Sequence, residues 1–380
     1  MKLLIHDLPE AAFSNFAPEY EGWEIIAAQG DIRPCVGCFG CWVKTPGRCV
    51  VKDGYEDSPV KLHQAEEIVF LSRLRYGCLS GAAKNVIDRC IGYVLPFFEI
   101  AHGEMHHQRR YEEEKPVSFR FYGPSTPAER AQAEEYAAAV CRNMRSRVKA
   151  VTFENFDFAP DEPAALEPAA SARTVLLNCS SRGKKANSAM FLEKLAADLK
   201  TPFETLELAQ HLRAPEQLIP KLLGAEQIVL GAGLYVDGPP SQLLRLLEAL
   251  EAAGGMAGKR IYAVTNMGLY ESRQLRNLFN TLRLWCKRTG AVYSGGLAIG
   301  AGEMYDRIGS IPFETGPGRH IALGAKRLAA AIDADAATED IYAEPFAFPR
   351  IAYVTAANLG WPRGGKQNGL SKEELYYRYD

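Results

Sequence analysis

The sequence predicts an α/β protein of two tandem domains, each a doubly wound parallel sheet with helices on both faces. Two observations predict this fold. Short apolar runs rich in strand-forming residues alternate with longer stretches that carry apolar residues at helical spacing, which is the pattern of βαβ units. The same succession of elements then occurs a second time, at a period of roughly 160 residues, so the pattern indicates a duplicated domain rather than a solenoid.

A segment without apolar periodicity separates the two halves. Residues 155–172 combine prolines, acids and alanines, and we expect them to form a linker. The predicted domains are therefore 1–154 and 173–340. The remaining C-terminal extension, 341–380, is aromatic and polar, and we expect it to pack on a domain or a partner. A chain of 380 residues suits two domains of about 150 to 200 residues each.

Four strands and two helices are predicted in the first half. Each strand is a short run of apolar and β-branched residues that ends in a polar or glycine-containing loop. The strands are "MKLLIHD" (1–7), "EGWEIIAA" (21–28), "EEIVFLSRLRYG" (66–77) and "VSFRFYG" (117–123), and the helices are "AAKNVIDRCIGYV" (82–94) and "PAERAQAEEYAAAVCRNMRSR" (127–147).

The second half repeats this order. Its predicted strands are "RTVLLNC" (173–179), "AEQIVLGAGLYVDGPP" (225–240, with its loop), "KRIYAVTNMG" (259–268) and "VYSGGLAIG" (292–300). Helical spacing follows each of them, in 189–199, 241–255, 273–290 and 321–333.

Composition and charge exclude several classes of function. The net charge of −2 gives no field that would draw the protein to nucleic acid or to an anionic membrane. No window approaches the apolar length of a membrane span, and the N-terminus lacks the features of a signal peptide. We therefore expect a cytoplasmic protein with no nucleic-acid or membrane partner. The mixed run "HHQRRYEEEK" (106–115) is predicted to be solvated surface, its histidines included.

The loop after the first strand of the second half has the composition of an anion site. "SSRGKKANS" (180–188) offers hydroxyls, cations and a glycine directly before a helix N-terminus, where backbone amides and the helix dipole favour a phosphate. The alternative is an ordinary strand-to-helix turn in which Asn187 or Ser188 caps the helix. The candidate phosphate ligands are Ser180, Ser181, Arg182, Asn187 and Ser188.

The first half lacks an equivalent loop. "DLPEAAFSN" (7–15) carries two acids, no basic residue and no glycine, and its negative side chains would repel a phosphate. We therefore expect this loop to be degenerate and a nucleotide to bind only in the second half.

Two further loops of the second half suit a flat ligand. Gly231 and Gly233 would let a backbone approach a ring system, and Tyr235 would stack on it or meet its edge. "TNMG" (265–268) would form the facing wall. The alternatives are that Tyr235 is a rim aromatic and Gly268 a turn glycine.

"LLNCSSRGKKANS", "IVLGAGLYVDGPPSQLLRLLE" and "AVTNMGLYES" resemble the NAD(P)H-dependent FMN reductases of the flavodoxin-like fold. The resemblance implies two flavodoxin-like domains, FMN as cofactor, NAD(P)H as reductant and an unknown small-molecule or protein electron acceptor. It assigns the phosphate to the first loop. Because such reductases often build the flavin site at a dimer interface, it also leaves a homodimer open. The resemblance also implies that five residues flank the isoalloxazine ring: Leu234, Tyr235, Val236, Asn266 and Gly268.

Four of the nine cysteines lie close together in the first half, as C-x2-C-x2-C-x7-C: Cys35, Cys38, Cys41 and Cys49. Zinc sites usually separate two pairs of ligands by a longer gap, so this spacing suits zinc poorly. Compact C-x2-C-x2-C runs with a fourth cysteine nearby are a way of holding a [4Fe–4S] cluster. A redox dithiol and a set of reduced structural thiols remain the alternatives. The five other cysteines are scattered, and we expect them to be buried small hydrophobes.

"PCVGCFGCWVKTPGRCVVKDG" (34–54) resembles the cysteine segment of iron–sulfur flavoproteins, where a four-cysteine motif carries a [4Fe–4S] cluster beside FMN. Three interpretations of function follow. The first is an FMN-dependent oxidoreductase that passes electrons from NAD(P)H to an acceptor. The second is an iron–sulfur flavoprotein for electron transfer. The third is a flavodoxin-like binding module without enzymatic activity.

Overall fold

The computed structural model describes residues 1–29, 31–158, 166–309 and 311–380. The chain forms two compact units. Unit 1 comprises Met1–Asp161 together with Val354–Asp380, and unit 2 comprises Glu162–Tyr353. Part of the predicted linker 155–172, residues 159–165, lies outside the described residues.

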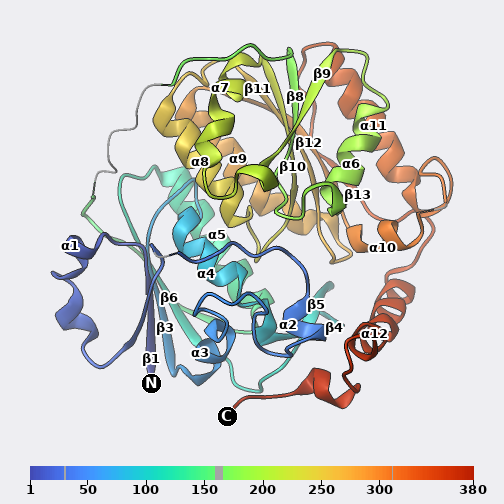
Figure 1. Cartoon of the computed structure of the whole chain (residues 1–380). Helices are drawn as coiled ribbons and strands as arrows, with labels where there is room; N and C mark the ends of the chain where they lie inside the picture. Colours follow the sequence, from blue (N-terminus) through green and yellow to red (C-terminus); the bar gives the residue numbers. More distant parts are fainter. Residues whose placement is uncertain (30, 159–165, 310) are drawn as a thin grey trace. The chain divides into compact units, whose positions relative to one another are not determined.

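Unit 1 is built on a five-stranded parallel sheet in the order β2-β1-β3-β6-β7 (Figure 1). Taken along the chain, these strands have the order 2-1-3-4-5, the doubly wound arrangement of flavodoxin-like proteins. An antiparallel hairpin, β4-β5, is inserted between β3 and β6. The strands are β1 (Lys2–His6), β2 (Glu24–Ala27), β3 (Glu67–Arg73), β4 (Val94–Ala101), β5 (Glu104–Arg109), β6 (Pro116–Tyr122) and β7 (Arg147–Phe153).

The helices of unit 1 begin where local signals favour them. Thr126 and Glu129 form a capping box in front of Pro127 at the start of α5, and the Ser80 hydroxyl accepts from Ala83 N at the start of α4. Helix α12 runs from unit 2 into unit 1. The helices are α1 (Glu10–Phe13), α2 (Gly40–Val43), α3 (Ser58–Gln64), α4 (Gly81–Asp88), α5 (Pro127–Asn143) and α12 (Arg350–Gln367).

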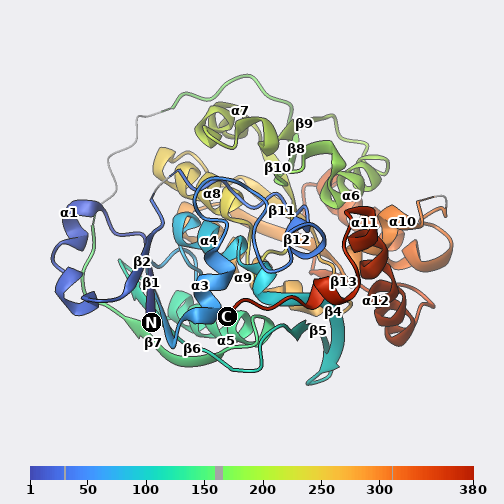
Figure 2. The same ribbon diagram turned by 60° about the horizontal axis from the view of Figure 1, so that its bottom comes forward.

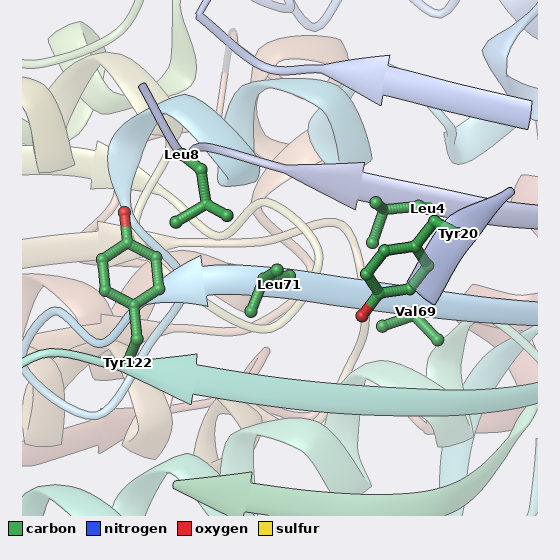
Figure 3. Close-up of a cluster of buried hydrophobic side chains, with 6 residues drawn as sticks. All are labelled: Leu4, Leu8, Tyr20, Val69, Leu71 and Tyr122. Carbon is green, nitrogen blue, oxygen red and sulfur yellow. The ribbon is translucent and has the colours of Figure 1, made fainter. Parts of the chain in front are cut away.

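One hydrophobic cluster of unit 1 packs side chains from β1, β3 and β6 against the segment before β2. Figure 3 shows these side chains on one face of the sheet, with the Tyr122 hydroxyl pointing toward the end of β1, where Leu8 lies. Burial of each aliphatic side chain contributes about 1.5–3 kcal/mol. The cluster consists of Leu4, Leu8, Tyr20, Val69, Leu71 and Tyr122.

The C-terminal segment of unit 1 packs along the hairpin. Leu375 is fully buried against Leu95 and Phe97, and Trp361 packs at the edge of the same cluster. Figure 2 shows the chain leaving α12 and passing near β4 on its way to the C-terminus. Gln64 at the end of α3 donates to the Asp380 backbone oxygen.

Unit 2 contains a six-stranded parallel sheet in the order β13-β12-β11-β10-β8-β9. Along the chain this order is 2-1-3-4-5 with a sixth strand added at the far edge, so the fold class predicted from the sequence is confirmed in both units. The strands are β8 (Thr174–Asn178), β9 (Phe203–Glu207), β10 (Gln227–Gly233), β11 (Arg260–Asn266), β12 (Val292–Ile299) and β13 (Ile341–Ala343).

Helices cover both faces of this sheet. The pair α6 and α11 packs on one face and the pair α8 and α9 on the other (Figure 1). Because both faces are covered, the central strand β10 is a nearly continuous buried run rather than an alternating one. The helices are α6 (Asn187–Ala196), α7 (Ile219–Gly224), α8 (Ser241–Ala253), α9 (Arg276–Thr289), α10 (Gly302–Arg307) and α11 (Arg319–Asp333).

Two sequence predictions for the first half are wrong. The helix predicted over 82–94 ends at Asp88, and the chain enters strand β4 at Val94. The run 106–115 is not uniformly solvated surface. Within it His106, Arg110 and Lys115 are buried, because residues 104–109 form the second strand of the hairpin and carry the run into the interior of unit 1.

Candidate functional site

The loops at the carboxyl ends of the unit 2 strands meet at one edge of the sheet. Strand order reverses between β8 and β10, which is where ligands bind in doubly wound sheets. Backbone hydrogen bonds join these loops, because Leu234 N donates to Asn266 O at 2.8 Å and Gly302 N donates to Met267 O at 2.7 Å. The residues predicted to hold phosphate and ring thus belong to loops at the same edge.

Asn178, the last residue of β8, organises the candidate phosphate loop. Its Nδ2 donates to Gly183 O at 2.9 Å and to Glu207 Oε2 at 2.8 Å. Its Oδ1 accepts from Ser180 N at 3.2 Å and from Ser188 Oγ at 2.9 Å. The Ser188 hydroxyl therefore donates its proton to Asn178, so its role is to stabilise the conformation of the loop. Asn178 was not among the site residues predicted from the sequence.

The other candidate phosphate ligands lie around the start of α6. Ser180 is buried, and its Oγ accepts from Arg182 N at 3.2 Å. Ser181 is half-buried and the Arg182 side chain is exposed. Helix α6 begins at Asn187 with Ala186 at the N-cap and no side-chain cap, so the alternative of an Asn187 or Ser188 cap is not observed. The positive end of a ten-residue helix thus faces this loop.

Glu303 of α10 brings a carboxylate to the same place, and sequence reasoning missed it. Its side chain is a hydrogen-bond partner of Asn187 and is attracted by the Arg182 guanidinium. A Cβ on Gly268 would lie 3.5 Å from Glu303 Cγ. Burial raises the pKa of Glu303, while Arg182 and Asn187 oppose that rise. The loop therefore offers a cation and an amide to an acidic side chain, and a ligand phosphate would compete with Glu303 for them.

The loop after β10 has a strained backbone at the candidate ring site. Tyr235 and Gly238 exchange two backbone hydrogen bonds of 3.1 Å, which closes a tight turn. Within it Val236 and Asp237 have φ of 38° and 60°. A β-branched residue in this region is an outlier that costs of order 1–3 kcal/mol, and such strain clusters at ligand sites. Leu234, Tyr235 and Val236 are all half-buried.

The three glycines of this region have different surroundings. A Cβ on Gly231 would lie 2.4 Å from Leu192 Cδ1, so this glycine allows α6 to pack close to the sheet. The prediction that Gly231 allows a ligand to approach the backbone is therefore wrong. A Cβ on Gly233 would lie 3.4 Å from Tyr235 Cε1, so the tyrosine ring lies beside it. Gly268 is half-buried, and its carbonyl oxygen accepts from Tyr353 Oη at 2.6 Å.

Asn266, at the end of β11, is buried. Its Nδ2 donates to Ala232 O at 3.4 Å, and a Cβ on Gly302 would lie 3.1 Å from its Oδ1. The Asn266 side chain thus contacts the strand β10 and the loop at Gly302, and its backbone oxygen accepts a hydrogen bond from Leu234 N.

The equivalent position in unit 1 is filled by a carboxylate of the protein. Asp7 follows β1 and is buried, and it accepts from Ser72 Oγ at 2.8 Å, from Arg73 N at 3.1 Å and from the Ser80 hydroxyl. The Tyr122 hydroxyl is a further partner, and burial raises the pKa of Asp7. The donors at this strand end therefore already serve an internal anion.

The four cysteines at positions 35, 38, 41 and 49 of unit 1 are free thiols. Cys41 and Cys49 are buried, Cys35 is half-buried and Cys38 is exposed. The five scattered cysteines are all buried, as expected; they are Cys78, Cys90, Cys141, Cys179 and Cys286.

Backbone amides approach two of the sulfurs. Gly37 N donates to Cys35 Sγ at 3.5 Å, and Gly40 N donates to Cys38 Sγ at 3.4 Å. Burial raises the pKa of Cys35 to about 12 and that of Cys41 well above the ordinary thiol value. These groups are therefore neutral thiols at pH 7 without a metal, which disfavours a reactive dithiol. Among the described residues, no group of three or more His, Cys, Asp or Glu could hold a metal ion.

Comparisons with known proteins give little similarity. No family model matches this chain, and no curated protein matches it. An azoreductase from Bacillus anthracis str. Sterne is similar in structure over 44% of this chain and 100% of its own, at 13% identity and a TM-score of 0.32. The Trp repressor binding protein from Bacillus subtilis is similar over 41% and 96%, at 14% identity and a TM-score of 0.33.

A third solved structure, an oxidoreductase from Corynebacterium diphtheriae, is similar over 43% of this chain and 96% of its own, at 14% identity and a TM-score of 0.34. The assignment of the fold rests on the strand orders of the two sheets, because likeness at such TM-scores adds nothing to it. No helix within the described residues has both the length and the hydrophobicity to span a membrane.

Proposed function

We propose that this protein is an FMN-dependent oxidoreductase whose flavin binds at the strand-end loops of unit 2. The observation that carries the proposal is the loop 180–188 at the switch point of the sheet, where Arg182 and Asn187 interact with Glu303 beside the N-terminus of α6. A cation and an amide beside a helix N-terminus have the chemistry that a phosphate requires.

The residues divide into three roles in this proposal. Ser180, Ser181, Arg182 and the first amides of α6 would hold the phosphate, with Asn187 as a further donor. Ser188 supports them by fixing Asn178. The ring would lie against the loop Leu234–Tyr235–Val236 and the segment from Asn266 to Gly268, whose backbone groups would bond its heteroatoms.

Bound flavin would supply the redox chemistry, since it accepts a hydride from NAD(P)H and passes electrons to a small-molecule or protein acceptor. The chain's own part is to bind, orient and exclude water. The strained turn at Val236 and Asp237 holds backbone in a fixed position before any ligand arrives, which lowers the ordering cost of binding.

The test is an FMN titration of the full chain, followed by anaerobic oxidation of NADH and of NADPH with a dye acceptor. Arg182→Ala should weaken FMN binding about tenfold or more, because a charge-assisted contact to phosphate is lost. Arg327→Ala removes another exposed arginine, on α11, and should leave affinity unchanged. A chain that binds no FMN would overturn the proposal. Flavin binding without NAD(P)H oxidation would favour the binding module instead.

The structure lends no support to a second function at the cysteine segment. Among the described residues, Cys35, Cys38, Cys41 and Cys49 included, no group of three or more His, Cys, Asp or Glu is placed to hold a metal ion. The [4Fe–4S] cluster that the spacing suggests is therefore not carried into the proposed function.

A further inference from the structure

The segment that follows β11 has three consecutive carbonyl oxygens that already accept hydrogen bonds from unit 2. The outer two accept from backbone amides of the loop after β12, and the middle one accepts from a tyrosine hydroxyl. The bonds run from Gly302 N to Met267 O at 2.7 Å, from Ala301 N to Leu269 O at 2.7 Å and from Tyr353 Oη to Gly268 O at 2.6 Å.

The other side of the same segment presents backbone amides. The peptide bonds of the described residues are trans, and in a trans peptide the carbonyl and the following N–H point in opposite directions. The bonds to the three carbonyls therefore turn the N–H groups of Gly268, Leu269 and Tyr270 away from those partners. Within the described part of the chain, these three amides have no hydrogen-bond acceptor.

Strand order shows which loop the amides face. Because β11 lies between β10 and β12, the segment after it has the loop after β10 on one side and the loop after β12 on the other. Asn266 O accepts from Leu234 N at 2.8 Å and so faces the loop after β10, whereas the next carbonyl, that of Met267, faces the loop after β12. The first and last amides of residues 268–270 therefore face the turn 234–236, across the candidate ring site.

This wall of the candidate ring site thus offers donors and no free acceptor. Successive backbone N–H groups of this kind favour an anion or the acceptor atoms of a ligand. The side chains of the segment are engaged elsewhere, since Leu269 is buried and Tyr270 Oη donates to Phe348 O at 2.9 Å. Tyr353, which is 5% exposed, is the one side chain that holds the middle carbonyl.

We propose that Tyr353 is a positioning residue that keeps this row of amides directed at the pyrimidine edge of a bound flavin, and that the row favours the reduced flavin. The inference rests on the proposed function. Hydride transfer from NAD(P)H gives the flavin two electrons and one proton, leaves NAD(P)⁺ and puts one negative charge on that edge, so no further proton is required. Amide donors bind a charged edge more strongly than a neutral one, which raises the reduction potential. Without the Tyr353 hydroxyl, the Gly268 carbonyl is free to turn and repel the same edge.

The test is the midpoint potential of FMN bound to the full chain, measured by anaerobic equilibration with a dye of known potential. In Tyr353→Phe, the affinity for reduced FMN relative to oxidised FMN should fall about tenfold, a decrease of about 30 mV for two electrons. Tyr262→Phe is the matched control, because this buried tyrosine of β11 also donates to a backbone carbonyl, Ala336 O, at 2.8 Å. It should leave the potential unchanged.

Hydrogen exchange measured by mass spectrometry gives a second readout, because bound FMN should slow exchange at residues 268–270 of the wild type. A wild-type chain that binds no FMN overturns the proposed function and this inference with it. Bound FMN with an unchanged potential in Tyr353→Phe overturns this inference alone, as does an equal fall in Tyr262→Phe. Exchange at residues 268–270 that bound FMN does not slow also overturns it, whatever the variants do.

Discussion

Glu303 places a carboxylate beside the loop that is proposed to hold a phosphate dianion. We expect Glu303→Gln to tighten FMN binding about tenfold, because a like charge is removed while the amide keeps a hydrogen bond to Asn187. The measurement is quenching of flavin fluorescence on titration with the full chain. Because the carboxyl has a raised pKa, the gain should shrink as pH falls and Glu303 itself becomes neutral.

Asp306 provides the matched control for this experiment. It is an exposed acid on the same short helix, and Asp306→Asn changes the net charge by the same amount. Equal effects of the two variants would indicate a general charge effect. Weaker FMN binding by Glu303→Gln would contradict the competition and would make Glu303 a ligand instead.

His6 is expected to make the stability of unit 1 depend on pH. It is buried and stacked on Phe13, with ring centroids 4.1 Å apart, and burial lowers its pKa to about 4. Between pH 6.5 and 4 the unfolded chain binds more protons than the folded one, so stability is full above pH 6.5 and is lost as pH falls through this window. The loss should amount to about 3 kcal/mol.

Urea unfolding of the wild type and His6→Phe, at steps between pH 7 and pH 4, measures this contribution. The variant keeps an aromatic ring against Phe13 and cannot gain a proton. The difference in free energy of unfolding between the two proteins should therefore shrink or change sign toward pH 4. Parallel curves for the two proteins would show that His6 does not titrate in this range.

At the scale of elements, the predicted strands are those with a continuous apolar run. β3 and β10 are buried on both faces, and their sequences show it directly. β7, β9 and β13 escaped prediction because each is an edge strand with polar or exposed residues, and β13 has only three residues. Such strands are specified by pairing with a neighbour, which a local pattern does not record.

The candidate site was predicted in the same uneven way. Its loops could be located from the sequence, because polar residues and glycines follow buried strands. The residues that form hydrogen bonds and ion pairs with those loops could not be predicted. Glu303 lies more than a hundred residues from Arg182 in sequence, and Asn178 resembles an ordinary strand end. Arg110 sits in a run of alternating charge, and only the packing of the hairpin and the C-terminal segment around it turns this surface pattern into a buried cation.

The C-terminal segment stabilises unit 1 through Leu375. This side chain is fully buried against Leu95 and Phe97, so we expect Leu375→Ala to lower the free energy of unfolding by about 2–5 kcal/mol. Loosening of the segment should also speed alkylation of Cys41, because Arg110 would lose two carbonyl partners. Leu359→Ala removes an exposed leucine from α12 and should change neither quantity.

Mass spectrometry after timed treatment with iodoacetamide gives the rate of alkylation at each cysteine. Cys286 lies in unit 2 and serves as an internal reference. Unchanged labelling of Cys41 in a destabilised Leu375→Ala chain would show that the segment does not shield the cysteines.

At the scale of the whole molecule, the two units share a backbone plan and differ in chemistry. Each has a tight turn after its third strand, closed between Arg75 and Cys78 in unit 1 and between Tyr235 and Gly238 in unit 2. At the end of the first strand, unit 1 has the buried acid Asp7 directly after β1, whereas unit 2 has the neutral amide of Asn178 as the last residue of β8. The same strand end therefore satisfies an internal anion in one unit and suits an external anion in the other.

The path of the chain separates the roles of the units in a testable way. Unit 1 is completed by residues 354–380, while unit 2 is a continuous stretch that ends at Tyr353. We expect a chain that ends at Tyr353 to bind FMN within about threefold of the full chain, because the candidate residues and the bond from Tyr353 to Gly268 remain. Unit 1 should be destabilised in the same molecule, since it loses Trp361 and Leu375 from its apolar cluster.

Hydrogen exchange measured by mass spectrometry, alongside the FMN titration, resolves the two effects. Exchange should rise in β4 and in residues 35–49, whose neighbours are removed, and stay unchanged in β8, β10 and β11. A chain ending at Gln367 keeps Trp361 and loses only Leu375, so its unit 1 should be intermediate in protection. Loss of FMN binding from both shortened chains, with the strands of unit 2 still protected, would mean that the flavin site requires residues from the C-terminal segment, and the assignment of the site to unit 2 alone would be wrong.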